Sequence, residues 1–513
     1  MAEQLLTTSI QAPGFMGLNL QDSSVGLEDG FATEATNCVI DRGGRVGSRK
    51  GWSPVSDVNA SLTGFDVKTI GQLITADGTG YIVIAGNTKL FLSSGATLTE
   101  LTYGGGGSTP TITDDHWQMA SLSGALYIYQ LGHDPLVFDP TTSTTEYTRV
   151  SEMASYAGTV QSANCVISAY GRTWSANTTT DKSLIQFSDL LAGQVLTTGT
   201  AGTLDITEIW PSGGDEIISL AAHNGFLYIF GRRQVLIYAG ATDPSTMYLS
   251  DAVSGIGCLA RDSVVVTGGD IVFLSDSGVR SLMRVVQEKS APMRELSLNV
   301  KESLISDMAG VDADTIKAVY SDTDAFYLLS LSSVDKVYCF DMRNTLQNGA
   351  ARTTVWTGIT PKSFCYTRGK RLLLGQTSYV GLYEDYTDNT VAYRMAYYTN
   401  YFSFQKATVI KILKKVGIIF SGGNGNYVTL KWGFDYDTLS RSHTIRLLAA
   451  SPAEFGLSEY SEAEFTNNIY FSNKVFQGSG AGTVLQLGVE TEINGSSLSV
   501  QKLDCYVKEG RTR

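Results

Sequence analysis

The sequence predicts an all-β protein, with a β-propeller-like repeat domain between an N-terminal extended segment and a C-terminal β-rich domain. Three observations predict this class. A pattern of short apolar strands recurs between residues 63 and 390. The chain is rich in residues that suit turns and strands, with 53 glycines and 26 tyrosines among 513 residues. Only one segment has the period of an amphipathic helix.

The second strand of each repeat is the clearest, because it is apolar on both faces, as expected for a sheet packed between two others. Seven copies occur, at residues 81–84, 126–129, 172–174, 227–230, 271–274, 326–329 and 372–374. The preceding turns end at Gly or Asp, which tolerate the positive φ of tight hairpins. Copies follow at 44 to 55 residues, a spacing typical of propeller blades. A meandering β-sandwich is the alternative, and a six-bladed ring with one copy used elsewhere fits as well as seven blades.

The pattern divides the chain into three parts: a docking segment at 1–62, the repeats at 63–390 and a β-rich domain at 391–513. Insertions interrupt the repeats near 190–215 and 285–315. The second contains the one expected helix, where Leu296, Val300, Leu304 and Met308 recur every four residues. Since the repeats begin near residue 65, we expect the propeller to fold without residues 1–52.

Two hairpins are expected in the C-terminal domain. The first joins strands at 416–420 and 427–432 through the Gly- and Asn-rich turn 421–426. The second joins 484–493 and 498–507 through Asn494-Gly495, a strong hairpin signal.

The charge pattern argues against a protein that grips nucleic acid. The formal net charge is −12, whereas a nucleic-acid grip needs a basic face. An acidic wall would still let DNA slide past, because it repels phosphates. Charged residues make up 17% of the chain, against about 25% in average proteins. Few charges and many tyrosines indicate surface covered by partners, although large β proteins also have this composition.

The cysteines are expected to be buried and reduced. All six are far apart in sequence, and several lie in apolar strand-like runs. Residues 1–20 lack the basic and apolar regions of a signal peptide. No window approaches the roughly 18 apolar residues of a membrane span. We therefore expect synthesis and assembly in a cytoplasm, and no membrane span.

A search for catalytic chemistry yields no site, so we expect no enzyme activity, metal or cofactor. The four histidines lack a metal-ligand spacing, and no G-x-S-x-G motif occurs. Residues 255–260 match a dinucleotide fingerprint, but no βαβ unit surrounds them, so we interpret them as a bend between blades. Asp114 and Asp115 are expected on opposite faces of a strand, which would prevent them from acting as a pair.

The N-terminal segment carries an ordered set of small and polar residues. It contains Gly17-Leu18-Asn19, Asp22, Glu28-Asp29-Gly30-Phe31-Ala32, Asn37, Gly43-Gly44-Arg45 and Arg49-Lys50-Gly51. This order, over about 35 residues, resembles the start of the tail hub proteins of short-tailed phages (podoviruses), also called tail nozzle or stabilisation proteins. The repeats extend the resemblance, in architecture, to about residue 390.

The resemblance implies a non-enzymatic virion protein of the phage tail. It implies a homo-oligomeric ring, usually hexameric, that docks on the tail adaptor protein. The ring would close and conduct the DNA exit channel, with viral DNA passing through the lumen without sequence-specific binding. A side face would dock tail fibres or a tailspike.

The motif residues that we expect at the interface with the adaptor or a neighbouring subunit are Asn19, Asp22, Asn37, Gly43, Gly44, Arg49, Lys50 and Gly51. The two glycines allow a tight turn between strands. The asparagines can cap exposed backbone. Arg49 and Lys50 can pair with acids of the partner. The alternative for each residue is a solvated loop position.

The alternative function is a carbohydrate-binding or carbohydrate-cleaving β-propeller involved in host recognition. Ser275-Asp276-Ser277-Gly278 resembles part of the Asp-box turn of sialidase-like propellers, but it lacks the Trp and no other blade repeats it. A cellular propeller scaffold is a third possibility, which the unusual N-terminal segment disfavours.

Overall fold

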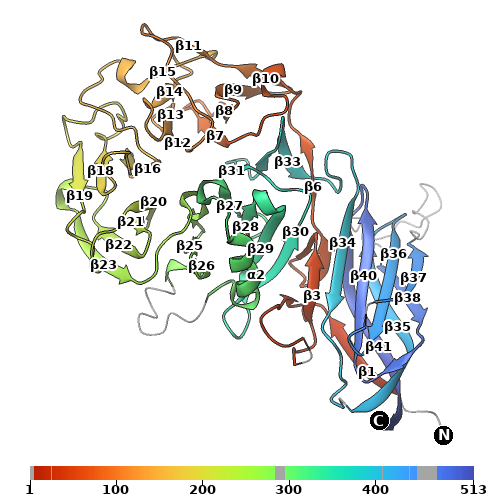
Figure 1. Cartoon of the computed structure of the whole chain (residues 1–513). Coiled ribbons are helices and arrows are strands. Elements are labelled where there is room, and N and C mark those ends of the chain that lie inside the picture. The colour runs from red at the N-terminus through yellow and green to blue at the C-terminus, as the bar shows by residue number, and fades with distance from the viewer. Residues whose placement is uncertain are drawn as a thin grey trace, which may run out of the picture.

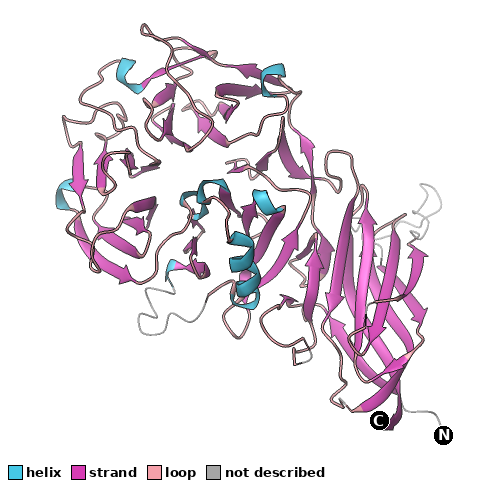
Figure 2. Ribbon diagram, viewed as in Figure 1, coloured by secondary structure: helices cyan, strands magenta, loops and turns pink. Residues whose placement is uncertain are grey.

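The computed structural model describes residues 5–24, 26–283, 295–406, 408–437, 439–447 and 471–512. The protein is all-β, with a propeller and a C-terminal β-sandwich (Figure 1). The one α-helix that lies wholly within the described residues is α2 (Lys301–Met308), and short 3-10 turns are also present (Figure 2). None of these helices is long and apolar enough to cross a membrane.

Seven sheets surround the propeller axis. Six have four or more strands and one has three. The first four sheets are formed by β7 (Thr69–Ile74), β8 (Gly80–Gly86), β9 (Lys89–Ser94) and β10 (Thr97–Glu100); β11 (Thr102–Tyr103), β12 (Trp117–Leu122), β13 (Ala125–Gln130), β14 (Leu136–Phe138) and β15 (Glu146–Arg149); β16 (Cys165–Ala169), β17 (Arg172–Ala176), β18 (Leu184–Phe187) and β19 (Gly202–Asp205); and β20 (Ile217–His223), β21 (Phe226–Gly231), β22 (Gln234–Ala239) and β23 (Tyr248–Ser254).

The remaining three sheets complete the ring. They contain β24 (Val265–Val266), β25 (Ile271–Ser275) and β26 (Gly278–Ser281); β27 (Ile316–Ser321), β28 (Phe326–Leu331), β29 (Lys336–Thr345) and β30 (Ala351–Trp356); and β31 (Ser363–Tyr366), β32 (Leu372–Gly375), β33 (Val380–Glu384) and β6 (Gly51–Pro54). The innermost strands contact one another in chain order, from β7 through β12, β16, β20, β24 and β27 to β31, and β31 contacts β7. All seven copies therefore contribute to one ring, and the propeller prediction is confirmed.

The second strands form the core between blades, as their sequence predicts. In β13 and β28 every residue is buried. Apolar clusters lie between neighbouring sheets, for example around Leu227 and Ile229 against Trp174, or around Phe230 against Phe273. Burial on both faces explains why these strands lack the polar alternation of a sheet with one face in water.

The C-terminal domain is a sandwich of two sheets. One sheet contains β34 (Tyr393–Thr399), β40 (Leu485–Ile493), β36 (Tyr427–Phe434) and β37 (Arg441–Arg446). The other contains β38 (Phe471–Gln477), β35 (Val409–Gly422), β39 (Ala481–Gly482) and β41 (Leu498–Thr512), joined by β1 (Leu5–Gln11), β5 (Val46–Ser48) and β4 (Cys38–Ile40). Their apolar residues, such as Ile418 and Leu430, share one buried core.

Both expected C-terminal hairpins are wrong. The strands are present, but β35 and β36 belong to different sheets, as do β40 and β41. Each turn therefore crosses from one layer of the sandwich to the other. Gly422, Gly423 and Gly495 have positive φ, so these glycines allow the chain to bend sharply at each turn. The local pattern does not specify whether the flanking strands share hydrogen bonds or pack face to face.

The N-terminal segment contributes strands to both the propeller and the sandwich. β1 pairs with β41, and β2 (Gly17–Leu18) pairs with β3 (Phe31–Thr36), which lies between β30 of the propeller and β34 of the sandwich. β6 supplies the outer strand of the seventh blade. Residues 1–62 therefore supply strands to both the propeller and the sandwich.

The expected helix is present but shorter, since residues 298–300 form a 3-10 turn before α2. Within the insertion at 190–215, β19 is the fourth strand of its blade. Residues 284–294 of the other insertion lie outside the described residues. Five of the six cysteines are buried and Cys365 is partly buried, and all are free thiols, in agreement with the sequence prediction.

Candidate functional site: the N-terminal motif and the centre of the propeller

Arg49 of the N-terminal motif is buried and contacts Asn37, Asp388 and Tyr393. Its side chain is fully buried, and its two terminal nitrogens donate to the carboxylate of Asp388 at 2.8 and 2.6 Å. Its Nε donates to Asn37 Oδ1 at 2.9 Å, and its guanidinium lies 4.0 Å from the ring centroid of Tyr393. A planar guanidinium suits this bidentate and stacked arrangement, which a lysine would not reproduce.

Asn37 extends this contact to three parts of the chain. It is 4% exposed and has a positive φ of 53°, which asparagine tolerates. Its Oδ1 also accepts from Thr357 N at 2.9 Å, and its Nδ2 donates to Arg394 O at 2.9 Å. Asn37 and Arg49 therefore tie the N-terminal segment to the end of the propeller and the start of the sandwich.

The glycines of the motif permit close backbone contacts. Gly43 and Gly44 form the turn between β4 and β5. Gly44 has φ 70°, and a Cβ there would lie 2.5 Å from Pro13. Gly51 begins β6, and a Cβ there would lie 1.9 Å from the carbonyl oxygen of Thr387. Positions 44 and 51 therefore require glycine for the chain's own packing.

Asn19 and Asp22 form a local turn. Asn19 is 3% exposed, its Oδ1 accepts from Gln21 N and Asp22 N at 3.1 Å, and its Nδ2 donates to Asp22 at 2.9 Å. Both residues line a surface cleft of about 480 Å³, and Asp22 is the exposed one. Of the two residues, Asp22 is therefore the one whose side chain a partner could reach.

Lys50 lies in a second cleft, of about 390 Å³, between the propeller and the sandwich. The cleft is also lined by Arg42, Arg45 and Arg343. Lys50 is partly buried, with its ammonium 5.9 Å from the ring centroid of Tyr383. The expected interface residues thus separate into two groups. Five are buried within the chain, namely Asn19, Asn37, Gly44, Arg49 and Gly51, whereas Asp22, Gly43 and Lys50 are exposed or partly exposed. The assignment of the eight residues to an interface with the adaptor or a neighbouring subunit stays a prediction.

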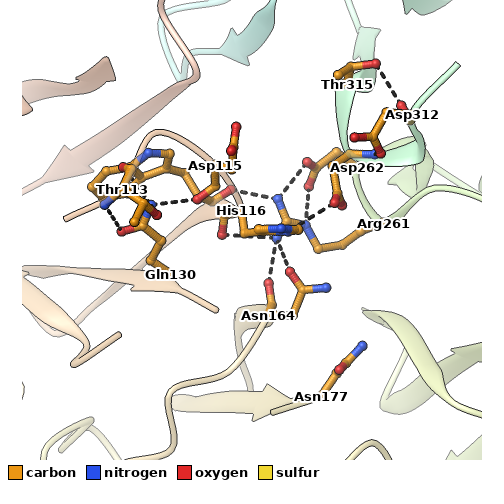
Figure 3. A network of polar contacts seen from close by, with 12 residues as sticks. Thr113, Asp115, His116, Gln130, Asn164, Asn177, Arg261, Asp262, Asp312 and Thr315 are labelled. Carbon is orange, nitrogen blue, oxygen red and sulfur yellow. Dashed lines mark hydrogen bonds and ion pairs between the residues drawn. The ribbon is translucent and has the colours of Figure 1, made fainter. Parts of the chain in front are cut away.

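A polar network occupies the centre of the propeller (Figure 3). Arg261, just before β24, donates to Asn164 O and Oδ1 at 2.7 Å and to Trp117 O at 2.8 Å. These acceptors precede or begin β16 and β12, on other blades of the ring. Asp262 pairs with Arg261 at 2.8 Å and with Lys317 of β27. Arg261 and Asp262 together therefore link four blades at the centre.

Each acid of this network that forms an ion pair lies beside a basic side chain: Asp262 beside Arg261 and Lys317, and Asp314 beside His116. Burial alone would raise the pKa of Asp262, but Arg261 and Lys317 outweigh it and hold the pKa well below its ordinary value. His116 Nδ1 lies 3.1 Å from Asp314, and this contact raises the pKa of His116 and lowers that of Asp314. The network is therefore suited to hold blades together.

A cleft of about 300 Å³ lies beside this network, lined by Asp114, Asp115, His116 and residues of β27 and its neighbours. Asp114 and Asp115 precede β12 in a bend, so both line the same cleft. The expectation that they lie on opposite faces of a strand is wrong, because the strand begins only at Trp117. Among the described residues no group of three His, Cys, Asp or Glu side chains is arranged to hold a metal ion.

Sequence reasoning missed Arg261 and Asp388. Arg261 directly follows residues 255–260, which form the link between β23 and the next blade, as predicted. A lone arginine after a bend gives no signal of contacts with residues about a hundred positions away. Asp388 lies more than 300 positions from Arg49, so only the fold brings the two together.

No protein-family model and no curated protein matches this chain. Among solved structures, PorZ of the type-IX secretion system of Porphyromonas gingivalis is 13% identical, with a TM-score of 0.37 over 64% of this chain and 37% of that chain. The WD40 propeller domain of Doa1 is 10% identical, with a TM-score of 0.39 over 65% and 96%. The extracellular domain of BT3049 from B. thetaiotaomicron is 11% identical, with a TM-score of 0.39 over 67% and 42%. The chain thus spans well under half the length of PorZ and of the BT3049 domain.

Proposed function

We propose that this chain is a non-enzymatic virion structural protein, a ring-forming subunit of the tail nozzle or hub of a short-tailed phage. The ring would dock on the tail adaptor, close and conduct the DNA exit channel, and dock tail fibres or spikes. The observation that carries the proposal is the N-terminal motif together with its place in the fold.

Four of the motif residues occupy positions at which their types are physically required. Arg49 and Asn37 hold the propeller to the sandwich, and Gly44 and Gly51 allow contacts that any Cβ would block. These small and polar residues of the motif therefore build the contact between the propeller and the sandwich. The resemblance to tail hub proteins then concerns residues that specify an architecture, rather than scattered surface positions.

The charge distribution supports a passive conduit. Residues 63–390 contain 33 acidic and 21 basic residues, so the propeller carries the whole net charge of the chain. A wall of this sign weakens contact with phosphates. The centre of each propeller holds the Arg261 network, so DNA would pass through the lumen between copies.

Assembly tests the proposal. The purified chain should form a ring, alone or after addition of tail particles that end at the adaptor, visible by light scattering and negative-stain electron microscopy. Tails that lack the protein should gain a distal ring and retain their DNA. A chain that stays monomeric and never joins such particles would refute the proposal.

The cleft at the propeller centre favours one second candidate, carbohydrate binding in host recognition. It places Asp114, Asp115 and His116 side by side, and carboxylates can accept hydrogen bonds from sugar hydroxyls. Asp114 lies 3.5 Å from Lys68, and Asp314 is engaged by His116, which leaves Asp115 for a ligand. Host polysaccharide should then bind the wild type and not Asp115→Asn, measured by glycan array. No binding by either protein would eliminate this candidate.

A further inference from the structure

The cleft of about 390 Å³ that contains Lys50 lies where the propeller meets the sandwich (Figure 1). We call it the junction cleft. Its lining comes from three parts of the fold, namely the N-terminal segment around β4 and β5, the propeller strands β28, β29 and β33, and the sandwich strands β35 and β41. The cleft therefore exists only when the propeller, the sandwich and the N-terminal segment are assembled together.

Basic side chains exceed acids in the junction cleft. Its charged lining residues are Arg42, Arg45, Lys50, Arg343, Asp41 and Asp324. Arg45 pairs with Asp41 at 2.6 Å, and Arg343 pairs with the buried Asp341 at 2.7 Å. With Asp341 included, four bases face three acids, so the cleft is positive although the whole chain has a net charge of −12.

Two of these cations, Lys50 and Arg42, have donors that a ligand can use. The Lys50 ammonium lies 5.9 Å from the ring centroid of Tyr383, and within the described ranges it forms no hydrogen bond or ion pair. Arg42 donates one terminal nitrogen to Thr323 O at 2.5 Å, and its other side-chain nitrogens have no partner among the same residues. Ammonium and guanidinium groups are the usual donors to phosphate oxygens.

Two serine hydroxyls lie on the sandwich side of the cleft. Ser421 of β35 is directly opposite Ser499 of β41, and Ser499 is opposite Gly47 of β5. Opposite residues on neighbouring strands point to the same face of a sheet, so the three positions form one row. Glycine at 47 leaves room for Ser499, because a Cβ there would lie 2.9 Å from its Oγ.

All three residues of this row line the junction cleft. Neither serine hydroxyl forms a hydrogen bond in the part of the chain that the structure describes, so each can donate to a bound ligand. The donors of the cleft therefore come from two sides, cations from the N-terminal segment and hydroxyls from the sandwich. Donors on different sides suit the spread oxygens of a tetrahedral anion better than the two coplanar oxygens of a carboxylate.

We propose that the junction cleft binds a tetrahedral oxyanion, a phosphate group that is either free or carried on a small molecule. Lys50 and Arg42 supply the charge, and Ser421 and Ser499 supply neutral donors. Asp324, which lines the same cleft and forms no ion pair with any described residue, opposes binding. The inference goes beyond the proposed function and does not depend on ring assembly.

Isothermal titration calorimetry of the full chain with inorganic phosphate tests the site, with ionic strength held constant by sodium chloride. The wild type should bind one equivalent. Lys50→Gln/Arg42→Gln should weaken binding by about tenfold or more, because hydrogen bonds to charged groups are lost. Asp324→Asn should strengthen binding, because it removes the opposing carboxylate and keeps a similar shape. Titration with glycerol 3-phosphate distinguishes a free ion from an esterified one.

The matched control is Lys414→Gln/Arg368→Gln. Both residues are exposed, lie outside the junction cleft and form no ion pair with another described residue. The control removes the same two charges from the chain, so it should bind phosphate as the wild type does. Ser499→Ala, which leaves every charge in place, should weaken binding less than the double substitution does.

Three results would overturn the site: no saturable heat from the wild type with either phosphate, equal weakening in the control and in Lys50→Gln/Arg42→Gln, or weaker binding by Asp324→Asn. Melting temperatures without phosphate show whether each variant is folded. If the double variant does not fold, the opposite changes expected for Asp324→Asn and Ser499→Ala still decide the question. Ring assembly is measured separately, so failure of the site leaves the proposed function intact.

Discussion

Arg49 and Asp388 form a bidentate ion pair that joins the N-terminal segment to the end of the propeller. The oxygen–nitrogen distances are 2.8 and 2.6 Å, with the Arg49 side chain fully buried and that of Asp388 13% exposed. The two residues lie 339 positions apart in the sequence. The pair therefore fixes a contact between the segment before β6 and the segment after β33.

Removal of Arg49 should strongly destabilise the fold. In Arg49→Ala the Asp388 carboxylate would stay largely buried without its partner, a change that typically costs about 3–5 kcal/mol. Chemical denaturation followed by fluorescence should show this loss. Arg45→Ala is the control, since its pair with Asp41 is partly exposed and should contribute less than about 1 kcal/mol. Equal effects of the two substitutions would contradict the structural role of Arg49.

Gly51→Ala should weaken closure of the ring. The added Cβ would lie 1.9 Å from Thr387 O, so β6 would have to move away from its place beside β33. Overpacking of this kind costs about 1–3 kcal/mol or more. Gly80→Ala is the matched control, because nothing lies within 4 Å of a Cβ there. Thermal melts of the two variants should separate clearly; identical melts would show that β6 is dispensable.

Deletion of residues 1–54 should unfold the propeller as well as disturb the sandwich. The pairing of β6 with β33, and of β3 with β30, reverses the expectation that the propeller folds without residues 1–52. Limited proteolysis and far-UV circular dichroism of the truncated chain measure the effect. Deletion of residues 1–11, which removes only β1 at a sheet edge, should be milder. A protease-resistant propeller in the longer deletion would contradict this.

The His116–Asp314 pair should stabilise the propeller over a limited pH range. The pKa of His116 is raised above its ordinary 6.5, so its contribution is complete below that value and is lost as pH rises through the raised pKa. The pKa of Asp314 is lowered below 3.8, so its contribution is present above 3.8 and is lost as pH falls through the lowered pKa.

The wild type should therefore exceed His116→Asn in stability most between about pH 4 and 6.5. The difference should decline at higher pH, and it should stay near or below about 1 kcal/mol because both side chains are partly exposed. Denaturation at pH 5 and pH 9 tests this, with His133→Asn as the control variant. A pH-independent difference would contradict the pairing.

The thiols should react slowly in the native protein. Burial raises the pKa of Cys165, Cys258 and Cys365 to about 12, so little thiolate exists near neutral pH. A chromogenic disulfide reagent should label Cys365 first, since the other five cysteines are more deeply buried. All six should react after unfolding in guanidinium chloride. Rapid native labelling of Cys165 would contradict its burial.

The sequence by itself determined the repeating unit. All seven second strands are present, because an apolar strand after a tight turn specifies a hairpin that must be covered on both faces. It also determined the helix that contains Leu304 and the burial of most cysteines. These are properties of local patterns, which depend on neighbours close in the chain.

Only the tertiary structure decided which strands pair at long range. Local patterns are the same for a hairpin and for a turn between two layers, so β35 and β36 were wrongly expected to pair. The same limit applies to β6, whose partner lies about 330 residues away, and to Arg49, whose polar type suggested an exposed interface. Its burial follows from Asp388 and Asn37, because a buried charge is tolerated where a distant partner neutralises it, and the fold alone supplies that partner.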